Sequence, residues 1–462
     1  MLAVCRSIVE QDPTNGQGHL MLGLAYCQQA RLPEAHEAFL AVHQCAPDSK
    51  LPLCNALFAS LYRDDLDAAA ITRLHRELAA EIPCPLPARH GWPNPPDPER
   101  RLQIGYLSPD LRYHPVASFL APILAHHDRD RVEVTGYADH PAEDAMTARL
   151  RGYAAHWRRC HGWSDQRLAE QIAADGIDIL VDLAGHTAGN RASLLKVKPA
   201  PLQALYIGYP CTSGLATMDY LISDRWVSPP DKDNLYTETV CRQPGGFWCF
   251  EPPEQAPPVA PLPMLRNGCP TFGSFNNLPK LSPTTVALWV RVLEAVPAAR
   301  LVLQALAFAD APTREQVRER FAARGIDPGR LDLREPTLAF DRFLAGYSEI
   351  DIALDPLPFN GGTTTCQALW MGVPVITLPG EHFHSRMGLS ILRQLELDEL
   401  VADSAKDYVR TAAVLAADHG RLTALRRTLR ERMRASSLCD GPGAARALEA
   451  SYRTMWRAWC AG

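Results

Sequence analysis

The chain has 462 residues, of which 47% are hydrophobic and 21% charged, and its 47 basic and 52 acidic residues give a net charge of −5. These values are typical of a globular protein of about three domains, and the lack of a basic surplus argues against a nucleic-acid partner. No apolar run approaches the roughly 20 residues that span a bilayer, and the first residues lack the pattern of a secretory signal. The 13 cysteines form no CxxC pair, so we expect reduced, buried thiols in a cytoplasmic protein without membrane partners.

Two proline-rich stretches divide the chain. Residues 83–101 contain seven prolines and residues 251–263 contain six. Proline has no amide hydrogen to donate and fixes its own backbone, so such runs are not interior helices or central strands. We therefore expect three parts, at residues 1–82, 99–250 and 264–462.

The first part carries a repeat signal. Pro13 and Pro47 lie 34 residues apart, which is the tetratricopeptide period, and the residues between them match that repeat at Leu22, Gly23, Tyr26, Ala35 and Phe39. We expect an antiparallel helix pair followed by further helices over residues 48–80; an ordinary helical hairpin is the alternative. Because stable arrays need about three repeats, we infer a shortened array or a truncated gene start.

The other two parts alternate short β-rich runs with helical patterns. Runs that are apolar on both faces and separated by helix-length segments predict buried parallel strands in βαβ units. We expect strands at residues 102–108, 131–138, 177–185, 202–210 and 218–224, and again at 269–275, 299–306, 330–336, 350–356 and 373–380. This predicts two doubly wound α/β domains that face each other across a cleft, with ligands at the carboxyl ends of strands. A helix over residues 443–459 should dock its apolar stripe on a neighbouring domain.

The strongest candidate for a ligand site is the segment DPLPFNGGTTTCQALWMG, residues 355–372. A buried strand ends there, the pair Gly361–Gly362 forms a turn, and three threonines open a helix. Glycines allow a ligand close to the backbone, and the exposed amides and helix dipole attract an anion. The pattern predicts a phosphate-binding site. A capped helix with a tight turn and no ligand is the alternative, because it would have the same sequence pattern. No GK[ST] follows the glycines, so it is not a P-loop.

Three more segments place polar residues after predicted strands. Asn277 and Lys280 follow the first strand of the third part, where a lysine can neutralise a phosphate or simply be a solvated loop residue. His114 follows the first strand of the second part and His186 a later one; each can act as a base or hydrogen-bond donor, or only fix its loop. The pairs Asp128–Asp130 and Asp231–Asp233 lie in charged loops away from the cleft, so we expect no metal.

Together these segments resemble the catalytic region of glycosyltransferase family 41, the O-GlcNAc transferase and SPINDLY group. The pieces that carry the resemblance are SPDLRYHP, DGIDILVDLAGHT, PAPLQALYIGYPCTSG, FGSFNNLPKLSP, FNGGTTTCQALWMGVPV and the terminal LEASYRTMWRAWC. The resemblance implies a GT-B fold of two Rossmann-like domains behind a tetratricopeptide segment. It also implies an inverting, metal-independent transfer from a nucleotide sugar to serine or threonine of proteins.

By position, the resemblance assigns His114 as the active-site histidine, either the base or a group that orients the sugar. Lys280 matches the lysine that holds the donor diphosphate, and Asn277 matches a polar residue beside it. The phosphates are expected at Gly362, Thr363 and Thr364. We expect both His114 and Lys280 to be catalytic.

The chain departs from O-GlcNAc transferases at several positions. Gln367 stands where they place an acidic residue on the ribose, and Phe343 where they place a histidine near the base, so base recognition would fall on backbone groups near Leu338. Gly362 replaces another histidine, and His186 stands where the animal enzyme has tyrosine. His186 and Gly208 are expected to line the cleft.

These departures lean towards the SPINDLY-like branch, some of whose members use GDP-fucose. UDP-GlcNAc is our first choice of donor and GDP-fucose the alternative, with no further cofactor. An alternative hypothesis outside enzyme function is a catalytically inert scaffold in which the repeat binds partner proteins. The presence of Lys280, the threonines and both histidines argues against that hypothesis.

Overall fold

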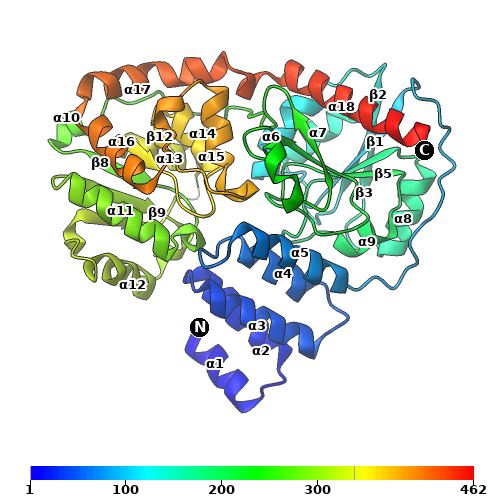
Figure 1. The fold of residues 1–462 in the computed structure, drawn as a ribbon, viewed down its shortest axis with the longest axis horizontal. Helices are drawn as coiled ribbons and strands as arrows, with labels where there is room; N and C mark the ends of the chain where they lie inside the picture. The colour runs from blue at the N-terminus through cyan, green and yellow to red at the C-terminus, as the bar shows by residue number, and fades with distance from the viewer. Residues whose placement is uncertain (1, 338) are drawn as a thin grey trace.

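The computed structural model describes residues 2–337 and 339–462. A small helical region, blue in Figure 1, lies against two α/β domains that stand side by side. Each domain holds one fully parallel sheet covered by helices. This arrangement confirms the predicted fold class, a two-domain α/β fold of the GT-B type preceded by helices.

The helical region begins with the predicted antiparallel pair. Its helices are α1 (Leu2–Gln11), α2 (Gly16–Gln28), α3 (Leu32–Cys45), α4 (Leu51–Ser60) and α5 (Ala68–Glu81). Gly23 of α2 faces the ring of Phe39 of α3, and a Cβ at Gly23 would lie only 2.6 Å from that ring. The small residue at this position of the repeat pattern therefore lets the two helices approach closely.

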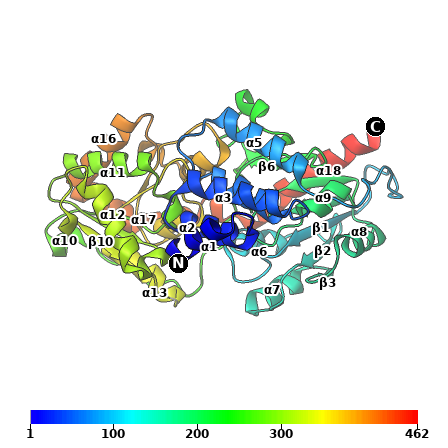
Figure 2. The same ribbon diagram turned by 90° about the horizontal axis from the view of Figure 1, so that it is seen from below.

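The helical region lies across both α/β domains, as Figure 2 shows from below. On the first domain, Lys50 Nζ donates to Asn190 O at 2.7 Å and Thr72 Oγ1 donates to Leu235 O at 3.0 Å. On the second domain, Thr284 N donates to Asp64 Oδ2 at 2.8 Å. The helical region is thus a bridge between the two domains.

The first domain is built on a seven-stranded parallel sheet with strand order β3-β2-β1-β4-β5-β6-β7. Its strands are β1 (Leu102–Ser108), β2 (Val132–Ala138), β3 (His156–Arg159), β4 (Ile179–Asp182), β5 (Leu202–Leu205), β6 (Tyr220–Asp224) and β7 (Thr239–Gln243). Its helices are α6 (Pro115–Leu124), α7 (Ala145–Tyr153), α8 (Asp165–Ala174), α9 (Ala192–Val197) and the 3-10 helix η1 (Pro230–Leu235). All five predicted strands are present, and the two missed ones, β3 and β7, are the edges of the sheet.

The second domain has a five-stranded parallel sheet with order β10-β9-β8-β11-β12. All five strands were predicted and are shorter than expected: β8 (Thr271–Ser274), β9 (Arg300–Gln304), β10 (Leu331–Arg334), β11 (Ile352–Leu354) and β12 (Val375–Ile376). The helices are α10 (Met264–Asn267), α11 (Pro283–Ala295), α12 (Ala311–Ala322), α13 (Phe340–Ala345), α14 (Thr363–Trp370), α15 (Met387–Gln394), α16 (Ala405–Ala417) and α17 (His419–Arg434). Short 3-10 helices lie between them: η2 (Leu278–Lys280), η3 (Leu306–Ala309), η4 (Pro328–Arg330), η5 (Gly346–Glu349), η6 (Phe383–Ser385), η7 (Asp398–Leu400) and η8 (Ser437–Cys439).

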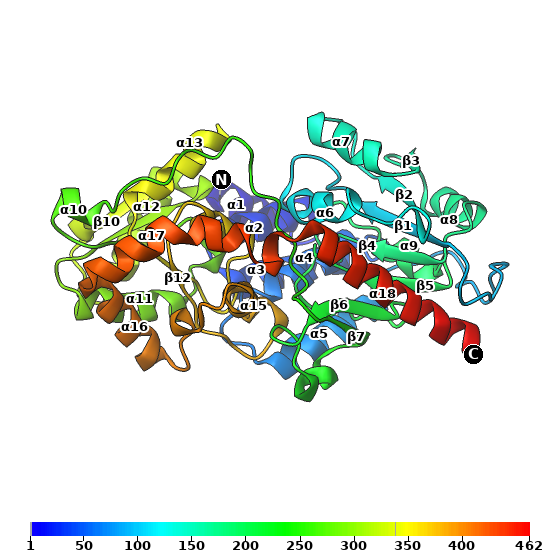
Figure 3. The same cartoon turned by 90° about the horizontal axis from the view of Figure 1, so that it is seen from above.

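The last helix, α18 (Gly441–Ala461), returns to the first domain, where it packs on α6, β5 and β7. Figure 3 shows α17 over the second domain and α18 over the first. The apolar stripe predicted to dock consists of Leu448, Tyr452, Met455, Trp456 and Trp459. The first four are buried, and Trp459 is partly buried.

The chain crosses between the domains twice, through residues 251–263 and between α17 and α18. The crossings lie side by side, because Phe250 N donates to Leu438 O at 2.6 Å and Ser437 Oγ donates to Gly245 O at 2.8 Å.

Two predictions from composition can be compared with the structure. Within the described residues, no helix combines the length and apolarity needed to cross a bilayer. All 13 cysteines are described and are free thiols. The expectation that they are all buried is wrong: Cys45 is exposed and several others are only partly covered.

Candidate active site

The two sheets place their ligand-binding edges opposite each other. In each sheet the strand order reverses beside the first strand: β1 lies between β2 and β4, and β8 lies between β9 and β11. Loops that follow the strands at such a point splay apart and leave room for a ligand. A cavity of about 710 Å³ lies there, lined by the loops after β1, β4, β8 and β11 and by residues of the helical region.

The start of α14 is the segment of the second domain that the sequence predicts to hold a phosphate. Gly362 is the N-cap residue of this helix and has no side chain with which to cap it, so the first amides are left for a ligand. A Cβ at Gly362 would lie 3.1 Å from the Trp248 ring, so a larger residue there would require a small shift of that ring. Gly361 N donates to Asp355 Oδ1 at 2.6 Å and fixes the turn before the helix.

Lys280 lies beside this segment on η2. Its Nζ donates to Asn360 O at 2.6 Å and to Asn276 Oδ1 at 3.3 Å, and it lies 4.4 Å from the centroid of the Phe359 ring. Burial lowers the pKa of Lys280 to about 8, although the nearby Asp355 carboxylate opposes this shift. An ammonium held by neutral groups is well suited to receive a diphosphate.

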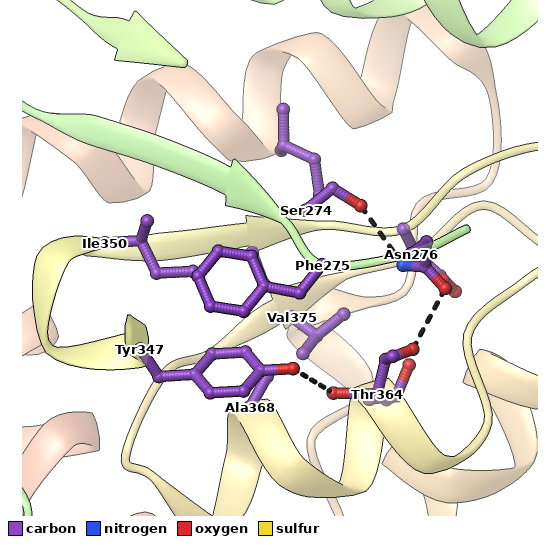
Figure 4. Close-up of a pocket in the computed structure, with 12 residues that line it drawn as sticks. Ser274, Phe275, Asn276, Tyr347, Ile350, Thr364, Ala368 and Val375 are labelled. Atoms are coloured by element: carbon purple, nitrogen blue, oxygen red, sulfur yellow. Dashed lines mark hydrogen bonds between the residues drawn. The ribbon is translucent and has the colours of Figure 1, made fainter. Parts of the chain in front are cut away.

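Asn276 connects the two parts of this wall, as Figure 4 shows. Its Nδ2 donates to Ser274 Oγ at 3.1 Å, while Thr364 Oγ1 donates to its Oδ1 at 2.9 Å. Thr364 O in turn accepts from Tyr347 Oη at 3.2 Å. The sequence singled out the neighbouring Asn277, which is exposed on the cavity wall.

The first domain contributes His114 to the opposite wall. Pro115 opens α6, and His114 is its N-cap residue, whose Nδ1 accepts from Val116 N at 3.3 Å. Burial lowers the pKa of His114, although Asp110 opposes the shift with Oδ2 at 3.6 Å from Nδ1. Because Nδ1 accepts the amide hydrogen, the ring in this arrangement carries its proton on Nε2.

Most predicted site residues lie in the wall of this one cavity: His114, Gly208, Asn277, Lys280, Gly362, Thr363 and Thr364. Gly208 fits for a steric reason, since a Cβ there would lie 1.7 Å from Leu183 O. Gln367 is buried one turn further along α14. Phe343 packs on Phe275, a wall residue, with ring centroids 6.0 Å apart. Leu338 lies outside the described residues.

The expectation that His186 lines the cleft is not met. Its side chain is buried next to Tyr209, with ring centroids 5.1 Å apart, and its Nε2 bonds Ser213 O at 2.6 Å. Burial lowers the pKa of His186 to about 4, so it is a neutral residue of the core. The prediction that His186 follows a strand is correct, but its side chain packs between the first domain and α5.

Several wall residues were missed by sequence reasoning. Phe58 and Tyr62 come from the helical region, roughly 300 residues before their partner Phe359. The rings of Tyr62 and Phe359 stack with centroids 4.7 Å apart and planes inclined by 13°. Asp139 and His140 follow β2. Of these wall residues, Phe359 alone lies in a predicted ligand-site segment, residues 355–372.

The acidic pairs lie away from the cavity. Neither Asp128–Asp130 nor Asp231–Asp233 is in its wall, and Asp233 forms an ion pair with Arg242. Across residues 2–337 and 339–462, no three histidine, cysteine or acidic side chains gather as a metal site.

Comparison with known proteins identifies the family. The model of glycosyl transferase family 41 matches residues 82–251 and 264–446. The chain belongs to this family. Probable UDP-N-acetylglucosamine–peptide N-acetylglucosaminyltransferases SPINDLY of Solanum lycopersicum and Oryza sativa are 39% identical to it over 90% and 92% of the chain. The chain spans about half the length of these relatives, 45% and 46% respectively.

A solved structure matches the whole architecture of this family member. It is that of a Thermobaculum terrenum O-GlcNAc transferase mutant, which is 36% identical with a TM-score of 0.94 and covers 100% of this chain and 88% of its own. The resemblance stated from the motifs is therefore confirmed for the family and for the fold.

Proposed function

We propose that this chain transfers a sugar, with inversion, from a nucleoside diphosphate sugar to serine or threonine hydroxyls of proteins, with UDP-GlcNAc as donor. The observation that carries this proposal is the single cavity in which Lys280 and the amides of α14 face His114. Family membership and the names of the related transferases support the same reaction class.

The donor diphosphate would lie on the first turn of α14, with Lys280 beside it. The acceptor oxygen attacks the anomeric carbon from the side opposite the diphosphate, a new C–O bond forms, and the bond to the leaving phosphate oxygen breaks with its electron pair. Negative charge grows on that oxygen, and preorganised donors aimed at growing charge lower the barrier. Lys280, the α14 amides and the Thr363 and Thr364 hydroxyls would supply these donors.

His114 would act on the sugar side. With its proton on Nε2, the neutral imidazole is a hydrogen-bond donor to a sugar hydroxyl or the departing oxygen. It becomes a base only in the other tautomer, which requires the loss of the bond from Val116 N. We therefore favour a role in orienting the donor, with the acceptor proton leaving to another group or to water.

A second cavity supports access for a protein acceptor. This groove of about 650 Å³ lies between the helical region and the second domain, and its wall includes Leu24 of α2 and Leu306 of η3. It shares Phe58, Tyr62 and Asn277 with the first cavity. An extended segment held along the helices would thus lead to the donor site.

The test is to incubate the purified protein with labelled UDP-GlcNAc, labelled GDP-fucose and a library of serine- and threonine-containing peptides. We expect transfer from one donor, and Lys280→Ala should reduce turnover by about 10²–10³. Lys406→Ala, a change of an exposed lysine on α16, is the matched control and should leave turnover intact. Transfer of fucose alone would select the alternative donor. No transfer and no nucleotide binding would leave the inert scaffold as the function.

A further inference from the structure

An aromatic stack lies under the ammonium of Lys280. Tyr62, just beyond α4, stacks on Phe359 at 4.7 Å between centroids, and Phe58 lies edge-on to Tyr62 at 5.4 Å. Phe359 is in the loop between β11 and α14, and its ring centroid is 4.4 Å from Lys280 Nζ. The helical region therefore touches the donor lysine through a single intervening ring.

The other groups around Lys280 leave it without a tight ionic partner. Asp355 is the nearby acid, but its oxygens accept from Gly361 N and from Thr377 Oγ1, both at 2.6 Å. His384 of η6 packs beside Phe359 with ring centroids 5.7 Å apart, and burial lowers its pKa to about 3, so it carries no charge near the lysine at neutral or higher pH. The direct partners of Nζ are Asn360 O, Asn276 Oδ1 and the Phe359 ring. Two of these partners, Phe359 and Asn360, belong to one loop, whose outer face Tyr62 covers.

We propose that Tyr62 is a positioning residue for the transfer reaction: by covering Phe359 it fixes this loop and keeps Lys280 poorly hydrated until a diphosphate binds. Tyr62 and Phe359 are both buried, so the stack excludes water from the side of the lysine that faces the helices. A cation over an aromatic face is held more strongly when it is desolvated. This inference rests on the proposed function, because it concerns the residue assigned to the donor phosphates.

The test uses calorimetric titration of UDP and of GDP at pH 7 and pH 9. The diphosphate binds the charged lysine, so affinity is present below the pKa of about 8 and is lost as pH rises through it. The wild-type protein should bind about tenfold more weakly at pH 9 than at pH 7. In Tyr62→Leu, water reaches the lysine and its pKa rises, so the same ratio should fall to about twofold, and turnover at pH 7 should fall about tenfold.

Two further variants separate positioning from general damage. Tyr62→Phe restores the ring and should restore the tenfold ratio. Tyr26→Leu changes another buried tyrosine of the helical region; it can lower the folded fraction but should keep the ratio at about tenfold. If Tyr62→Leu does not fold, Phe359→Leu removes the ring beneath the lysine and should give the same twofold ratio.

The outcomes are distinct. A folded Tyr62→Leu or Phe359→Leu protein that retains the tenfold ratio and full turnover would overturn the inference while leaving the proposed function in place. If the wild-type protein binds neither nucleotide at either pH, the proposed function fails instead.

Discussion

Trp456 should be a principal anchor of the first domain, although it lies only six residues from the C-terminal residue. Its ring is fully buried, its Nε1 donates to Asp97 O at 2.9 Å, and the Arg100 guanidinium lies 4.7 Å from its centroid. The change Trp456→Ala removes the buried ring, its hydrogen bond to Asp97 O and its contact with Arg100.

The expected cost follows from these contacts. Replacing a buried tryptophan by alanine typically costs about 3–5 kcal/mol, and a carbonyl left without its donor costs about 1–3 kcal/mol. These contributions overlap, so we expect a loss of about 4 kcal/mol in the free energy of unfolding, out of a typical total of about 5–15 kcal/mol. The loss should fall on the first domain.

Urea denaturation followed by circular dichroism measures this loss as an earlier first transition. Nucleotide binding should persist after that transition, because Lys280 and α14 belong to the second domain, whereas sugar transfer should stop. Trp459→Ala is the matched control, since Trp459 is only partly buried in the same helix. A Trp456→Ala protein that unfolds together with the control, or loses less than about 1 kcal/mol, would refute the reasoning.

Three other outcomes are expected. EDTA should leave turnover unchanged, because in the proposed reaction Lys280 and the α14 amides neutralise the diphosphate in place of a metal; loss of activity in EDTA would instead favour a metal at Asp128–Asp130 or Asp231–Asp233. Deleting residues 1–47 should reduce glycosylation of whole proteins more than that of peptides, measured side by side, whereas an equal loss would mean that α1–α3 only stabilise the rest. Calorimetry should show binding of both UDP and GDP, since Phe343 and Gln367 offer the base and ribose no charged group; a preference above about a hundredfold, roughly 2.7 kcal/mol, would contradict this.

The sequence predicted the central strands well because they are buried on both faces and therefore read as apolar runs. The two missed strands sit at the edges of their sheet, where β3 consists of His156–Arg159 and is half exposed. Such a strand lacks the apolar signature, and charged edges are how sheets avoid pairing with other chains. Strand lengths were overestimated because apolar residues continue past the strand ends: the predicted strand 269–275 includes Phe275, whereas β8 ends at Ser274.

The site was predictable where it is local in sequence. Gly362, Thr363 and Thr364 follow one strand directly, and the position of a strand's end places its loop in the cavity. The direction of a side chain is not encoded in this way: His186 also follows a strand, yet its ring turns into the core against Tyr209. Tyr62 could not be found at all, because its role depends on a fold that brings together residues about 300 positions apart.

The adjacent crossings at Phe250 and Leu438 give the two domains a common hinge. Any opening of the cleft must rotate about this point, since covalent connections between the domains pass through it. On the other side of the cleft, α4 and α5 span the gap, with Lys50 tied to the first domain and Asp64 to the second. Widening the cleft would break one of these ties, so the helical region holds the two domains together across the cleft.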